Sequence, residues 1–190
     1  MHTGERNYKW NAHVEFVKSL GNGQGEHLLK CGAVEELCTR TRHALNINLL
    51  HLQERLAFRD GLDGSALTVP FFEAFFQLWN SSAVDRPSFE AYIEAMCLLP
   101  HDDDRRLVTW PTATLLLFLA DPSRFMFLKP EVTKQAADGL AFDLLYDPAP
   151  TWHTYEKLLT MSAILMERLR PLGAIDWIDV QSFIWVIAEY

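Results

Sequence analysis

The chain has 190 residues, of which 49% are hydrophobic and 22% are charged, and its formal net charge is −8 at pH 7. This length and composition predict one soluble globular domain, residues 1–190, that buries a single sizeable core. The negative charge disfavours non-specific binding to nucleic acid, because a polyanion is repelled at long range unless one face of the protein is strongly basic.

The sequence also argues against membrane insertion and secretion. The most apolar run, residues 113–120, is far shorter than the roughly 20 residues that a membrane helix needs. Residues 1–10 lack the apolar core of a secretion signal. The three cysteines are an odd number without C-x-x-C spacing, which disfavours a disulfide framework and a zinc site. We therefore expect a cytoplasmic protein with no membrane partner.

Helical signals begin near the N-terminus. Residues 8–20 are predicted to form a short helix that ends at the glycine-rich turn 21–25, so residues 1–25 are expected to be a loosely attached helix and turn. Residues 26–60 have the apolar spacing of helices, but the asparagines at 46–48 compete with a helix by bonding their own backbone. We predict two helices in that region, one on each side of this break.

The rest of the chain carries clear helix start and stop signals. Thr109 is placed to cap a helix whose first turn holds Pro111, and Asp121 followed by Pro122 ends it. Further helices are predicted over residues 70–79, 87–99, 130–138 and 152–169. No alternating apolar and polar run is long enough for a half-buried strand. The expected fold is all-α, a single compact helical bundle or orthogonal array of about seven to nine helices.

The C-terminal segment DWIDVQSFIWVI, residues 176–187, has two interpretations. Asp176 and Asp179 have the spacing of an N-cap and the third position of a helix, where carboxylates accept hydrogen bonds from first-turn amides. The alternative is an acid pair that binds a metal or acts in catalysis. Capping explains the spacing fully, so we favour a buried helix with its own caps. A terminal strand remains open for this short β-branched run.

Two groups of basic residues are candidate binding sites. Arg40, Arg42, Arg55 and Arg59 lie on the two helices that flank residues 46–48 and form a candidate basic patch. Arginines of this kind often pair with acids of the same chain, and this is the interpretation that we favour.

The second candidate site surrounds the segment RFMFLKP. Arg124 and Lys129 bracket its apolar residues just before a helix that begins with a proline. Cations near a helix N-terminus, with aromatic neighbours such as Trp110, suit a phosphate or a carboxylate. Pairing with acids of the chain is again the alternative.

No motif predicts catalysis, a bound metal or a cofactor, and we expect none of the three. The turn at 21–25 lacks the Lys-Ser/Thr pair of a phosphate loop, and the sequence contains no H-E-x-x-H pair and no G-x-S-x-G elbow. The segment HDDDRR, residues 101–106, offers ligands for a divalent ion, but adjacent residues do not readily converge on one ion. A solvated loop is the favoured interpretation there.

Three motifs within residues 105–187 resemble a widespread family of uncharacterised bacterial helical proteins. They are W-P at 110–111, F-L-K-P at 127–130 and a closing D-x-I-D-x-Q-S-F-I-W-V at 176–186. The resemblance implies a bacterial protein in which Lys129 and Gln181 belong to a shared polar pocket or partner surface.

We therefore expect a non-enzymatic protein that binds either a protein partner or a small anionic ligand, with Trp110, Arg124, Lys129 and Gln181 as ligand-binding residues. One alternative is a metal-assisted hydrolase or nuclease that uses the C-terminal aspartates. Another is a nucleic-acid-binding protein that uses the basic patch. An exposed aromatic patch in residues 71–79 or 177–185 would favour a protein partner, whereas a cleft that contains Lys129 and Gln181 would favour a ligand.

Overall fold

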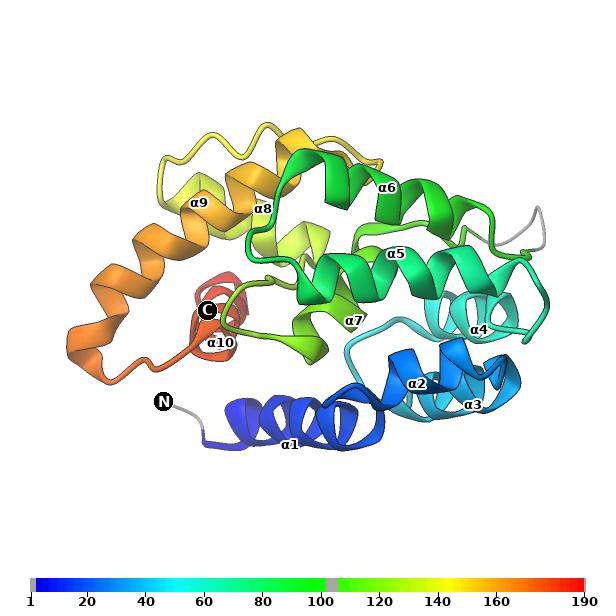
Figure 1. Cartoon of the computed structure of the whole chain (residues 1–190). Coiled ribbons are helices and arrows are strands. Elements are labelled where there is room, and N and C mark those ends of the chain that lie inside the picture. Colours follow the sequence, from blue (N-terminus) through cyan, green and yellow to red (C-terminus); the bar gives the residue numbers. More distant parts are fainter. Residues whose placement is uncertain (1–2, 102–105, 190) are drawn as a thin grey trace.

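The computed structural model describes residues 3–101 and 106–189, and within these ranges the chain forms helices and no strand (Figure 1). The all-α prediction is confirmed. The helices are α1 (Thr3–Leu20), α2 (Gln24–Lys30), α3 (Val34–Ala44), α4 (Leu52–Gly61), α5 (Thr68–Asn80), α6 (Arg86–Cys97), α7 (Trp110–Ala120), α8 (Pro130–Gly139), α9 (Trp152–Leu169), followed by the 3₁₀ turn η1 (Arg170–Leu172), and α10 (Trp177–Glu189).

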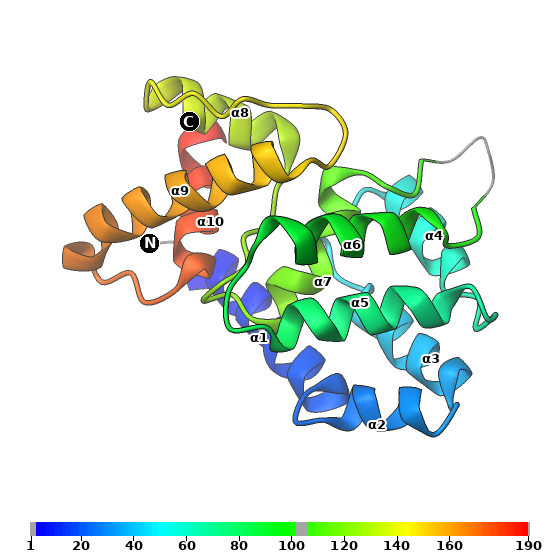
Figure 2. The ribbon, with the colours of Figure 1, turned by 45° about the horizontal axis from the view of Figure 1, so that its top comes forward.

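Helix α7 lies in the core of the molecule, and every one of its residues is buried. Its threonines remain satisfied there, because the hydroxyls of Thr112 and Thr114 donate to the carbonyls of Leu107 and Trp110 at 2.6 and 2.7 Å. Helices α1, α4 and α5 pack against it, and α5 and α6 lie side by side (Figure 2).

Side-chain caps lie at the starts of two helices, and the cap at Thr109 was predicted. At the start of α6, the Asp85 carboxylate accepts a hydrogen bond from the amide of Ser88 at 2.9 Å. At the start of α7, the Thr109 hydroxyl accepts a hydrogen bond from the amide of Thr112 at 3.5 Å. Both helices have a proline in the first turn, where its missing N–H leaves no bond unmade.

The aromatic run of α5 is part of the core. Phe71, Phe72, Phe75 and Phe76 are each at most 3% exposed, and they pack edge-on or stacked against one another. No helix in residues 3–101 and 106–189 combines the length and the apolarity needed to cross a membrane.

The prediction of two helices between residues 26 and 60 is wrong, because three helices occupy the region. The break at 46–48 separates α3 from α4, as predicted. A further break separates α2 from α3 at Gly32, whose φ of 71° is a left-handed conformation that glycine adopts without strain. The glycine-rich turn is also shorter than expected, because Gly25 already belongs to α2 and lies against the ring of Phe76.

Helix α1 links the two ends of the molecule. Helices α8, α9 and α10 gather at one end, and α2, α3 and α4 gather at the other (Figure 2). Helix α1 contacts α10 as well as α2 and α3. In place of the loosely attached segment that we expected, it buries Phe16 and Leu20 and bonds to α10 through Arg6 and Lys9.

Candidate functional site

A cleft with a volume of about 670 Å³ lies where four segments of the chain meet. These segments are α1, the loop that leads into α4, the loop that leads into α8, and α10. The lining consists of Tyr8, residues 48–52, Phe127, Lys129, Gln181 and Trp185. The cleft thus brings together Lys129 and Gln181, and we call it the Lys129 cleft.

Gln181 is a buried residue of this cleft, with 2% of its surface exposed. Its Oε1 accepts a hydrogen bond from the Nζ of Lys9, which is also buried. Because an ammonium group can only donate, the carboxamide must turn its oxygen toward Lys9, and this sets the direction of its nitrogen. Among the described residues nothing accepts a hydrogen bond from Nε2 of Gln181. This donor is therefore available to a group in the cleft.

Lys129 supplies positive charge to the cleft. It is the residue that immediately precedes α8, and its Nζ lies 4.4 Å from the centre of the Trp185 ring. This cation–π contact restrains the side chain. Lys134, one turn along α8, pairs with Glu131 at 2.8 Å, whereas no ion pair joins Lys129 to a carboxylate of the described residues.

The remaining polar lining adds further hydrogen-bonding groups. Asn48 and His51 are exposed and come from the loop before α4. None of the described lining residues carries a carboxylate. Together with Lys129 and Gln181, this lining suits a group that accepts hydrogen bonds and carries negative charge.

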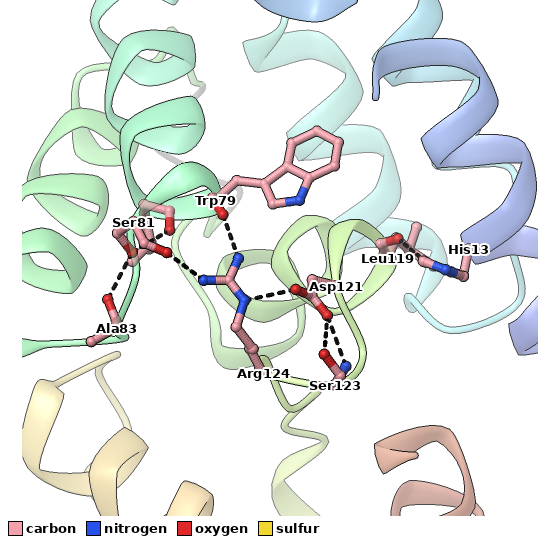
Figure 3. Close-up of polar contacts among 9 residues, drawn as sticks. His13, Trp79, Ser81, Ala83, Leu119, Asp121, Ser123 and Arg124 are labelled. Carbon is pink, nitrogen blue, oxygen red and sulfur yellow. Dashed lines mark hydrogen bonds and ion pairs between the residues drawn. The ribbon is translucent and has the colours of Figure 1, made fainter. Parts of the chain in front are cut away.

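Arg124 does not line the Lys129 cleft, although the sequence predicted a shared site. Its guanidinium spreads between Asp121, at 2.7 Å from Nε, and the carbonyls of Trp79 and Ser81 at the end of α5 (Figure 3). The last carbonyls of a helix have no partner within it, so Arg124 closes the end of α5. The hydrogen bonds of Arg124 are therefore made within the protein and stabilise the fold.

Trp110 also lies outside the cleft. It is 1% exposed, and its Nε1 donates to the carbonyl of Asp147 at 2.7 Å. Its ring stacks on that of Tyr155, with 6.4 Å between the centroids. Trp110 is therefore a core residue that anchors the loop before α9.

Asp176 caps α10, as predicted, whereas Asp179 accepts from an amide that precedes the helix. Asp176 Oδ1 accepts from the amide of Ile178 at 2.9 Å, and Asp179 Oδ2 accepts from the amide of Ile175 at 2.7 Å. Both carboxylates also bind the guanidinium of Arg6, with N–O distances of 2.8 and 2.9 Å to Asp176 and 2.8 Å to Asp179. The hydrogen bond with Asp176 raises the pKa of Arg6 above its ordinary value. Both carboxylates are therefore already bound by backbone amides and by the guanidinium of Arg6.

Three of the four arginines in the predicted basic patch pair with acids of the chain. The pairs are Arg40 with Glu36, Arg42 with Glu35 and Arg59 with Asp60, at N–O distances of 2.8, 2.5 and 3.3 Å. The fourth, Arg55, is half-buried on α4. This pairing reduces the positive field of the surface.

In the part of the chain that the structure describes, no group of three or more histidine, cysteine or acidic side chains is placed to hold a metal ion. The candidate segment 101–106 falls largely outside that part, because residues 102–105 are not described. His101 is described, and its Nδ1 lies 2.9 Å from the carbonyl of Leu99.

Sequence reasoning missed the contribution of α1 to the site. Lys9 and Gln181 are 172 positions apart, so no local pattern connects them. The sequence did contain one indication that Lys9 is buried. Lys9 precedes Phe16 by seven positions and Leu20 by eleven, and this helical spacing places it on the same buried face of the helix. A lysine in that position needs a buried acceptor.

Comparison of the chain with protein-family models, curated proteins and solved structures finds no match. The resemblance to a bacterial family with three shared motifs therefore stays a prediction.

Proposed function

We propose that this protein binds a small anionic ligand in the Lys129 cleft and does not act as an enzyme. The observation that carries the proposal is the meeting of Lys129, which has no acidic partner among the described residues, with the unused amide donor of Gln181. A carboxylate or a phosphate would accept hydrogen bonds from both groups, and bonds to ionised groups are the stronger kind.

The two donors are held in place before a ligand arrives. Lys9 sets the orientation of Gln181, and the Trp185 ring restrains Lys129. A restrained site loses little side-chain entropy on binding, which favours affinity. The volume of about 670 Å³ lies within the range of roughly 300–1,000 Å³ that is usual for small-molecule sites.

The alternatives have less support. The aromatic run of α5 is buried, and Trp177 and Trp185 of α10 are half-buried, so neither region presents a fully exposed aromatic patch to a protein partner. The hydrolase or nuclease hypothesis needs free carboxylates, but Asp176 and Asp179 bind Arg6 and backbone amides. The nucleic-acid hypothesis needs a strong positive field, and three of its four arginines are paired within the chain.

The proposal can be tested by titrating the protein with acetate and with inorganic phosphate. The reporter is the NMR signal of the Trp185 indole N–H, assigned with a Trp185→Phe variant. We expect a saturable shift in the wild type. Lys129→Gln should weaken binding by at least about tenfold, because it removes a hydrogen bond to a charged group.

Two further variants sharpen the test. Gln181→Glu keeps an acceptor for Lys9 but replaces the amide donor by a negative charge, so it should abolish anion binding without unfolding the protein. Lys134→Gln makes the same change of net charge as Lys129→Gln on a nearby lysine, and it should bind like the wild type. The proposal fails if neither anion gives a saturable shift, or if Lys129→Gln and Gln181→Glu bind as the wild type does.

A further inference from the structure

A second hollow, with a volume of about 700 Å³, adjoins the Lys129 cleft. It lies between α1, the end of α3 and the loop that follows α3. Tyr8 and Asn48 line both spaces, so the two are neighbours along α1. We call this second space the α1–α3 hollow.

Apolar residues line the α1–α3 hollow, as Leu50 and Phe127 line the Lys129 cleft. Ala12, Phe16, Ala44 and Ile47 contribute to the lining of the hollow, and Phe16 and Ile47 are buried at 1% and 7% exposure. Aliphatic and aromatic carbon in a concave surface gains free energy when an apolar group displaces water from it.

The charged residues of the hollow each lie near a group of opposite charge. Glu15 and Lys18 lie 3.9 Å apart, and Arg40 pairs with Glu36 at 2.8 Å. The hollow therefore lacks, among its described residues, a cation without an acidic partner, such as Lys129 provides in the cleft. The charge distribution assigns the acidic group of a ligand to the Lys129 cleft and an uncharged part to the α1–α3 hollow.

We infer that the ligand is a single-chain organic acid, an inference that rests on the function proposed above. Its acidic group binds Lys129 and Gln181, and its apolar chain passes Tyr8 and Asn48 into the α1–α3 hollow. A small hydrophilic anion would leave the apolar lining of the hollow unused. Two observations support one elongated occupant: the two spaces adjoin at Tyr8 and Asn48, and the cation without an acidic partner among the described residues lies in the Lys129 cleft.

The test is a calorimetric titration with acetate, hexanoate and decanoate, each below the concentration at which it forms micelles. Each methylene that enters the hollow should tighten binding by about threefold to fourfold. Ala12→Leu and Ala44→Phe fill the hollow from two different helices. Either variant should leave acetate binding unchanged and remove the gain with chain length, whereas Ala163→Leu, on the exposed surface of α9, should change neither.

The outcomes separate this inference from the proposed function. Acetate binding that depends on Lys129 but does not strengthen with chain length would overturn the inference and leave the function standing. Failure of all three acids and of inorganic phosphate to bind would overturn both. Sedimentation with vesicles that contain phosphatidic acid, together with no binding of the soluble acids, would point to a membrane lipid and would also overturn the inference.

Discussion

The contact between Arg6 and the two aspartates should be among the strongest polar contributions to the stability of this fold. Arg6 makes charge-assisted bonds of 2.8 and 2.9 Å to Asp176 and of 2.8 Å to Asp179. The side chains of the three residues are 25%, 11% and 3% exposed, so the aspartates are largely shielded from solvent. Replacing Arg6 by methionine would leave two acids close together without their cation.

The magnitude follows from this burial. Removing one partner of a buried ion pair typically costs about 3–5 kcal/mol, because the remaining charge is left uncompensated. Here the backbone amides of Ile175 and Ile178 still donate to the aspartates, and the partial exposure of Arg6 screens the pair. We therefore expect Arg6→Met to lower the free energy of unfolding by about 3 kcal/mol, at the lower end of that range.

The measurement is urea unfolding at neutral pH, followed by circular dichroism. Lys18→Met is the matched control on the same helix, because Lys18 lies 3.9 Å from Glu15 and both side chains are more than 70% exposed. An exposed pair of this kind contributes about 0–1 kcal/mol. A double-mutant cycle with Asp179→Asn should give a coupling energy of about 1–2 kcal/mol. An Arg6→Met variant no less stable than Lys18→Met would refute the reasoning.

Two further predictions concern titratable groups. Burial acts to raise the pKa of Asp121, but hydrogen bonds from Ser123 and Arg124 outweigh it and lower the pKa. The wild type should be more stable than Asp121→Asn above the pKa of the unfolded state, near pH 4, and this difference should vanish as the pH falls through the pKa of the folded state. Urea unfolding of both proteins at several acidic pH values would measure the difference. Burial raises the pKa of Cys38, whereas Cys31 is exposed. A thiol-specific disulfide reagent should label Cys31 in the folded protein and Cys38 only on unfolding, and equal rates would contradict this.

The local parts of the fold could be predicted because their causes are local. The D-x-x-D spacing predicted the cap of α10, and Thr109 with Pro111 predicted the start of α7. The break at Gly32 was missed because an isolated glycine within a helical pattern does not always end a helix. Its left-handed backbone is visible only in the structure.

The candidate site was only half predictable, for a related reason. The predicted family resemblance placed Lys129 and Gln181 in one site, and the structure brings them into one cleft. Arg124 has the same charge and lies close to Lys129 in the sequence, yet it donates hydrogen bonds to carbonyls at the end of α5. Which helix end lies beside Arg124 depends on how the helices pack, and the sequence around Arg124 does not indicate it. Trp110 likewise belongs to the core. Charge and spacing identify a cation, and only long-range packing decides what that cation contacts.

The Lys9–Gln181 contact connects the stability of the fold with ligand binding. Burying a lysine and a carboxamide side by side carries a desolvation penalty that an apolar pair of the same size would avoid. The contact aligns Gln181 so that its oxygen is used and its nitrogen is not. A hydrogen-bond acceptor in the cleft would satisfy that nitrogen, whereas a donor could not. A ligand that binds this arrangement would also stabilise the docked position of α1 by mass action, because the folded state alone assembles α1 and α10 into one cleft.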